Sequence, residues 1–181
     1  MAAENLPHPP PEDLAAFRVA QLLLVLVGVE KAVTLERLGY YDFFLANPML
    51  IDDLSDSDRT SLVMAGFDSR TIDHQSASQR FANRRQRLRA DVGTLVAYGL
   101  AQPAVSDGAI EYGPTDRGAQ AAEEFTARYA DGIRQAIGVV FPRLRRLSDR
   151  RLRDAGRRWL RAERFDLDLL GLEAVPSEVR S

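Results

Sequence analysis

The chain has 181 residues, 45% of them hydrophobic, which is enough for one ordinary domain with a substantial core. It contains no cysteine, so disulfides, thiol catalysis and cysteine-bound zinc are excluded, and we expect a cytoplasmic protein. The formal net charge of −2 hides two unlike halves, because residues 1–78 carry 5 basic and 12 acidic side chains whereas residues 79–181 carry 19 basic and 14 acidic ones.

The first predicted helix runs from Leu14 to about Lys31, with Asp13 as a candidate N-cap. It follows a proline-rich leader, residues 1–12, that we expect to be disordered. The helix is apolar nearly all round, which predicts burial on several sides, either at the centre of the domain or against a second subunit. Its most apolar run, residues 22–29, is too short to cross a bilayer, so we expect no membrane partner.

The second predicted helix begins at Thr34 and ends at Asn47, because the proline that follows disfavours helical geometry in the residue before it. It contains an aromatic cluster that we expect mostly in the core, with one or two members exposed to bind a partner protein. These candidate partner-binding residues are Tyr40, Tyr41, Phe43 and Phe44. Asp42 lies among them. It is either a pKa-shifted acid or recognition contact, or an aspartate held by a tyrosine hydroxyl, a backbone amide or a neighbouring arginine, and we favour the second interpretation.

Residues 51–78 combine an acidic loop, a short helix over residues 59–65 and a polar connection. The loop lacks the glycine and the closing glutamate of a calcium-binding loop, so we interpret it as a solvated loop that caps the helix. His8 and His74 are the only histidines and form no recognisable zinc set. The sequence has no nucleotide-binding or catalytic motif, so we predict no catalytic residue, metal or cofactor, and hence no enzyme.

A β-hairpin is predicted from two short strand-like runs, residues 100–105 and 109–112. Asp107 and Gly108 join them, and this dipeptide tolerates the positive φ angles of a tight hairpin turn. Pro103 removes a backbone donor from the first run, which therefore belongs at the edge of a sheet.

The predicted hairpin lies between two helices. One ends near Gly99, and the other begins after Pro114 with Thr115 as its N-cap. Helix, hairpin and helix are typical of the second half of a winged helix. We therefore predict a mainly α fold: a winged-helix domain over residues 13–141, with one β-hairpin wing and a C-terminal helical arm.

Basic residues gather on the helix before the hairpin. Arg80, Arg84 and Arg87 lie at positions i, i+4 and i+7, on one flank of its apolar stripe. In a winged helix this element enters the major groove, where arginine binds phosphates or guanine edges. The same scaffold often serves only as a protein-binding platform, so both functions are open for these side chains.

The C-terminal part is predicted as two helices and a tail. One helix runs over residues 119–141 and is stopped by Pro142, an arginine-rich helix covers residues 142–164, and an acidic and hydrophobic tail covers residues 165–181. The arginine-rich helix is either a solvated surface helix or an electrostatic contact with phosphates or an acidic partner. The candidate residues here are Arg145 and Arg146 for nucleic acid, and Trp159 and Phe165 for a partner protein.

Five stretches together carry a family resemblance: FRVAQLLLVL, TLERLGYYDFFLANP, AGFDSRTIDHQSASQRFANRRQRLRADVGTLVAYGL, YGPTDRG and RRLSDRRLRDAGRRWLRAE. Over about residues 14–164 the chain resembles the middle components of bacterial ABC three-component systems, of the middle component 2 type. The resemblance implies a small non-catalytic adaptor that accompanies an SMC-like ATPase and a variable effector, in defence against phage and plasmids. Such components are similar to the tandem winged-helix subunits of SMC–kleisin complexes, whereas only one wing is predicted here.

Three hypotheses follow. In the first, an adaptor contacts the ATPase or the effector through the aromatic helix and the C-terminal arm, with nonspecific phosphate contacts through Arg84, Arg87 and the arginine-rich helix. In the second, a stand-alone winged-helix transcriptional regulator forms a homodimer through residues 14–31 and reads an operator with the arginines before the hairpin. In the third, which we favour least, an enzyme has Asp42 and Tyr41 in its site.

Overall fold

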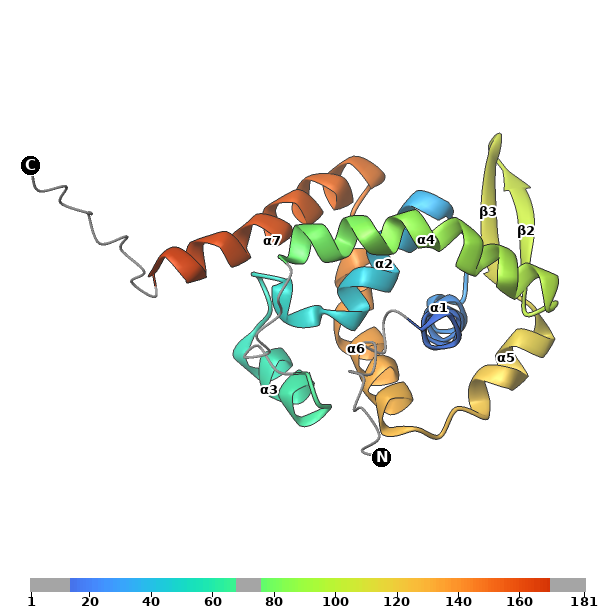
Figure 1. The fold of residues 1–181 in the computed structure, drawn as a ribbon, viewed down its shortest axis with the longest axis horizontal. Coiled ribbons are helices and arrows are strands. Elements are labelled where there is room, and N and C mark those ends of the chain that lie inside the picture. Colours follow the sequence, from blue (N-terminus) through green and yellow to red (C-terminus); the bar gives the residue numbers. More distant parts are fainter. Residues whose placement is uncertain (1–13, 68–75, 170–181) are drawn as a thin grey trace, which may run out of the picture.

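The structure is a computed structural model that describes residues 14–67 and 76–169, with side chains up to residue 161. It is mainly helical, with a small three-stranded antiparallel sheet (Figure 1). No helix in these ranges is both long and apolar enough to cross a membrane. The helices are α1 (Ala15–Val29), α2 (Leu35–Ala46), the 3-10 turn η2 (Pro48–Leu50), α3 (Asp56–Met64), α4 (Ala77–Ala97), α5 (Asp116–Glu123), α6 (Arg128–Leu144) and α7 (Asp149–Leu169). The strands are β1 (Val33–Thr34), β2 (Ala101–Ser106) and β3 (Ala109–Pro114).

Helix α1 lies at the centre of the fold, where α2, α4, α5, α6 and β3 all pack against it. Its residues 22–26 are at most 5% exposed, so the first of the two predicted placements is the observed one. The helix begins after Leu14, which has no side-chain cap, and Asp13 lies outside the described residues. It ends before the predicted Lys31, because Glu30 adopts a left-handed φ of 61°.

The sheet has β3 in the middle, with β1 and β2 antiparallel on either side. The hairpin prediction is confirmed: Asp107 and Gly108 form the turn with φ angles of 49° and 77°, and Pro103 lies on the edge strand β2. Strand β1, in which Val33 lies opposite Tyr112, was not predicted. It is only two residues long and merges into the start of α2, so no alternating pattern marks it.

Helix α2 has the predicted start and end, because the hydroxyl of Thr34 accepts a hydrogen bond from the backbone N–H of Arg37 and the helix ends at Ala46. The expectation that one or two of its aromatic side chains are exposed is wrong. All four are at most 5% exposed: Tyr40, Tyr41, Phe43 and Phe44. They lie in the core because α4, α6 and α7 enclose α2 on several sides, and they offer no surface to a partner.

The prediction of a single helix over residues 119–141 is wrong, because helix α5 ends at Glu123 and a second helix, α6, begins at Arg128. The guanidinium of Arg134, on α6, stabilises this break. It donates hydrogen bonds to the backbone carbonyls of Ala122 (2.7 Å), in the last turn of α5, and Phe125 (2.9 Å), just after that helix.

The predicted stop at Pro142 is also wrong, since α6 continues through it to Leu144. A proline near the end of a helix removes one backbone hydrogen bond. The side chains of Val140 and Leu144 are completely buried, and their packing keeps the last turn helical against the core. The predicted boundary between residues 141 and 142 therefore falls inside α6.

Candidate functional site

Helix α7 packs on α2, α4 and η2 through a stripe of apolar and small side chains. Leu152, Ala155 and Trp159 are at most 7% exposed, and the Trp159 ring stands edge-on to Phe44 with ring centroids 4.9 Å apart. Trp159, a predicted partner-binding residue, therefore belongs to the core. The side chain of Phe165 lies outside the described residues. This packing fixes which side of α7 faces the solvent.

Replacing Gly156 with alanine is expected to destabilise the protein by about 1–3 kcal/mol. A Cβ at this position would lie 2.7 Å from Cε1 of the buried Tyr40 ring, which cannot move aside freely. Gly93 in α4 is the matched control, because a Cβ there meets no atom within 4 Å. Gly93→Ala should stabilise by about 0.5–1 kcal/mol through helix propensity alone. Urea unfolding measures both, and equal stability of the two variants would contradict this packing of α7.

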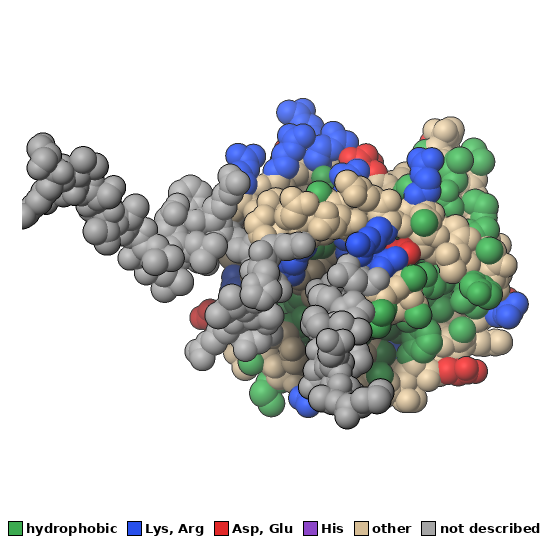
Figure 2. All heavy atoms as spheres, in the orientation of Figure 1, with side chains coloured by type: hydrophobic (Ala, Val, Ile, Leu, Met, Phe, Trp, Pro, Cys, Tyr) green, Lys and Arg blue, Asp and Glu red, His purple; other side chains and the backbone are tan. Residues whose placement is uncertain are grey.

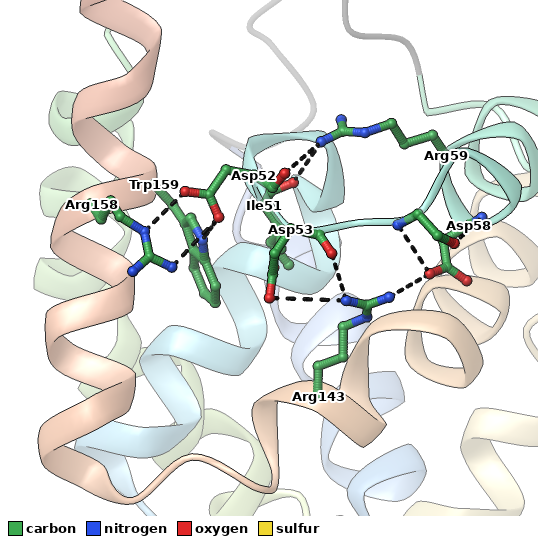
Figure 3. A network of polar contacts seen from close by, with 9 residues as sticks. Ile51, Asp52, Asp53, Asp58, Arg59, Arg143, Arg158 and Trp159 are labelled. Atoms are coloured by element: carbon green, nitrogen blue, oxygen red, sulfur yellow. Dashed lines mark hydrogen bonds and ion pairs between the residues drawn. The ribbon is translucent and has the colours of Figure 1, made fainter.

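The acidic loop after η2 is exposed to solvent, as predicted, and it is also tied to α7 (Figure 3). The carboxylate of Asp52 accepts hydrogen bonds from Nε of Arg158 (2.9 Å) and from the indole Nε1 of Trp159 (2.8 Å). Burial alone would raise the pKa of Asp52, but these hydrogen bonds outweigh it and lower the pKa below its ordinary value. Asp52 therefore acts as a charged anchor for α7.

The same loop is tied to α6 through Arg143, whose guanidinium donates to the backbone carbonyl of Asp53 (2.7 Å) and to the carboxylate of Asp58 (2.6 Å) (Figure 3). The predicted capping role is confirmed, because Ser55 and Asp58 form a reciprocal capping box at the start of α3. The hydrogen bond from Ser55 and the contact with Arg143 lower the pKa of Asp58.

The arginines of residues 143–161 divide into two sets. Arg143, Arg153 and Arg158 are paired with carboxylates, Arg153 with Glu36 at 3.1 Å. The others are exposed, and within the described part of the chain the structure gives them no carboxylate partner. They are Arg145, Arg146, Arg150, Arg151, Arg157 and Arg161. Figure 2 shows Lys and Arg side chains gathered over α7, at the upper edge of this view.

The candidate nucleic-acid residues Arg80, Arg84 and Arg87 differ in how far they are available to a ligand. Arg80 donates from Nη1 to the side-chain oxygen of Asn47 at 2.7 Å. Arg84 forms a two-pronged ion pair with Asp42, and its side chain is only 13% exposed. Arg87 is exposed. This flank of α4 packs on α2, where the buried Asp42 needs a cation, so two of the three guanidinium groups are used inside the fold.

Asp42, which is 2% exposed, is held by a polar network between helices. Its carboxylate also accepts a hydrogen bond from Nε2 of Gln21 (2.8 Å), and Gln21 in turn accepts one from the hydroxyl of Tyr129 (2.6 Å). Burial alone would lower the pKa of Arg84, but the charge and hydrogen bonds of Asp42 outweigh it and raise that pKa. The interpretation of Asp42 as an aspartate held by a neighbouring arginine is thereby confirmed.

Tyr41, the second residue of the enzyme hypothesis, has different partners from Asp42. Its hydroxyl accepts a hydrogen bond from Nε of Arg37 (2.5 Å), and Arg37 also pairs with Asp149 at the start of α7. Burial raises the pKa of Tyr41, and the interaction with Arg37 offsets this only in part. Asp42 and Tyr41 thus belong to two separate polar contacts that join helices to each other.

The free end of the hairpin is apolar. Val105 is 78% exposed and Ile110 is 56% exposed, and the two lie opposite each other in the β2–β3 register. Tyr98, just before β2, is 64% exposed. The hairpin, residues 101–114, carries no Lys or Arg, and its charged residues are Asp107 and Glu111. The apolar hairpin and the arginine-rich helix α7 lie toward opposite ends of α4 (Figure 1).

Comparison with known proteins provides no relative of this chain: no protein-family model, curated protein or solved structure matches it. Within the described residues, no three His, Cys, Asp or Glu side chains are grouped as a metal ion would require. The two surfaces are therefore the features from which a function can be argued: the hairpin end with Val105 and Ile110, and the outward arginines of α7. Sequence patterns marked the arginines but not the exposed hairpin pair, because alternation places Val105 on the same face of β2 as the buried Ala101 and so gives no sign of its exposure.

Proposed function

We propose that this chain is a non-catalytic adaptor that links an SMC-like ATPase to an effector, in a cytoplasmic ABC three-component system directed against phage or plasmid DNA. The observation that carries the proposal is the separation of an apolar hairpin end from an exposed arginine surface. An adaptor in a system that acts on DNA needs separate surfaces for protein and for nucleic acid, and unlike chemistry keeps these partners from competing for one of them. The family resemblance of the sequence agrees with this role.

We propose a winged helix as the scaffold of this adaptor. The elements α1, β1, α2, α4, β2 and β3 follow one another in the chain, and the sheet order is β1-β3-β2. In this order the short strand β1 pairs with the β2–β3 hairpin. The arrangement supports a winged helix in which the hairpin is the wing and α3 is an additional helix. The described residues contain one such wing, which distinguishes this adaptor from a tandem arrangement.

The hairpin end replaces the aromatic residues of α2 as the proposed contact with the ATPase. Val105 and Ile110 form an apolar pair with acidic residues beside it, so the partner surface should be apolar with basic residues around it. Complete burial of an aliphatic side chain of this size contributes about 1.5–3 kcal/mol. The pair can therefore supply a substantial part of the binding energy.

The alternative, a stand-alone transcriptional regulator, has less support. Its dimer helix α1 is covered by elements of its own chain, and two of its three operator-reading arginines, Arg80 and Arg84, are bonded inside the fold. Its wing would carry no basic side chain to meet the phosphates beside the groove.

The experiment is co-expression of the tagged chain with the neighbouring genes, followed by purification and identification of the bound subunits. Recovery of a long coiled-coil ATPase in fixed ratio is expected, as is its loss with the double variant Val105→Asp/Ile110→Asp. Gln102→Asp/Ser106→Asp adds the same charge to the other face of β2 and should keep the ATPase. A chain that purifies alone, or as a homodimer on one promoter sequence, would contradict the proposal.

A further inference from the structure

We propose that the exposed face of α7 binds the phosphate backbone of double-stranded DNA without regard to its sequence. The site is the row Arg150, Arg157 and Arg161, which the helical period of 3.6 residues places on one side of α7. Along the helix axis these residues are about 10 Å and about 6 Å apart at 1.5 Å per residue. Leu152 and Trp159 occupy the opposite, buried side.

The charges of this row are available to a ligand. In the described residues no carboxylate pairs with Arg150 or Arg157, whereas Arg153 and Arg158 on the flanks are held by Glu36 and Asp52. Arg161 uses its Nε to donate to the backbone carbonyl of Arg157 at 3.2 Å, which leaves the rest of its guanidinium outward.

Within residues 149–161, one acidic group, Asp154, lies on this exposed side of α7, and Asp149 at the start of the helix pairs with Arg37. Arg145, Arg146 and Arg151 extend the positive charge around the beginning of the helix. The face is therefore strongly positive even with Asp154 counted. A polyanion that binds this face would release counterions, and this release favours binding.

The composition of the face favours nucleic acid over an acidic protein. Protein interfaces have an apolar centre from which charged residues are depleted, whereas surfaces that bind DNA are polar and positive. The exposed large hydrophobic side chains of the described residues all lie on other elements. Residues 149–161 of α7 thus offer a protein no apolar anchor.

The same composition favours duplex DNA over other nucleic acids. Single strands are bound by stacking on exposed aromatic rings, and the aromatic ring of α7 within residues 149–161, Trp159, is buried. Proteins read duplex RNA through contacts that include its 2′-hydroxyl groups. Residues 149–161 contain no Ser, Thr, Asn or Gln, so arginine is the polar side chain there that could make such contacts.

The test is fluorescence anisotropy of the purified full-length chain with a short labelled DNA duplex at increasing salt. We expect a dissociation constant of about 1–100 µM near physiological salt, equal for two unrelated sequences. In Arg150→Gln/Arg157→Gln, the slope of log affinity against log salt concentration should be less steep by about 2. Each lost phosphate contact reduces the magnitude of this slope by about 0.9. The control Arg117→Gln/Arg128→Gln removes equal charge from α5 and from the start of α6, and should keep the slope.

Four results would overturn the proposal: no binding at low salt, equal slopes for the two double variants, clear preference for one sequence, or tighter binding to duplex RNA or a polyglutamate chain. Circular dichroism of each variant verifies that it is folded. The measurement uses the chain alone, so its failure would leave the ATPase contact of the hairpin unaffected. Failure of the hairpin contact would likewise leave this site standing.

Discussion

Asp42→Ala is expected to lower the free energy of unfolding by about 3–5 kcal/mol, the cost of breaking a buried ion pair by removing one partner. The substitution leaves the Arg84 guanidinium buried beside α2 without its carboxylate, and it removes an acceptor from Gln21. Few single substitutions cost this much, because an uncompensated charge in the interior is among the largest penalties. Urea unfolding followed by circular dichroism measures the effect.

Asp131→Ala is the control for this prediction. Asp131 pairs with Arg134 three residues along α6, and the two side chains are 69% and 40% exposed, so its loss should cost less than about 1 kcal/mol. If Asp42→Ala does not fold, Asp42→Asn keeps the shape and part of the hydrogen bonding and should be intermediate. Equal stability of Asp42→Ala and Asp131→Ala would mean that the network is not buried as described.

Trp159→Ala should cost a similar amount, about 3–5 kcal/mol, because it leaves a large cavity between α7 and α2. The substitution removes the edge-on contact with Phe44 and the indole donor to Asp52. We also expect α7 to lose its fixed orientation, so the DNA affinity of its arginines should fall with stability. Circular dichroism is the suitable probe, since Trp159 is the single tryptophan of the chain.

Trp159→Phe separates packing from hydrogen bonding. It keeps an aromatic ring in the core and loses the N–H donor, while Arg158 continues to hold Asp52. The expected loss is about 1 kcal/mol, with DNA binding retained. If the free energy of unfolding of Trp159→Ala is within about 1 kcal/mol of that of the unaltered protein, α7 is not anchored through this residue.

Local signals in the sequence predicted much of the fold. The Thr34 cap, the Asp107-Gly108 turn and the edge position of Pro103 each depend on residues close together in the chain. The helical periods of α1 and α4 depend on the same local geometry. The two-residue β1 and the break after α5 carry no such signal, because pairing with β3 forms β1 and Arg134 of the next helix stabilises the break.

Most of the candidate site could not be predicted, because it depends on which distant side chains meet. Arg84 is separated from Asp42 by 42 residues, and Arg158 from Asp52 by 106. No pattern within one helix tells a paired arginine from an available one. The arginine-rich composition of α7 was visible in the sequence, but the division between paired and outward side chains required its packing on Trp159.

In this account, the hairpin end binds the ATPase and the exposed face of α7 binds DNA. These two roles are tested together by comparing two double variants in the same co-purification and the same DNA-binding assay. Val105→Asp/Ile110→Asp is predicted to lose the SMC-like ATPase and to bind duplex DNA as the unaltered chain does. Arg150→Gln/Arg157→Gln is predicted to keep the ATPase and to lose DNA affinity with a shallower salt dependence. Loss of both partners in either folded variant, or no change in either, would contradict the account.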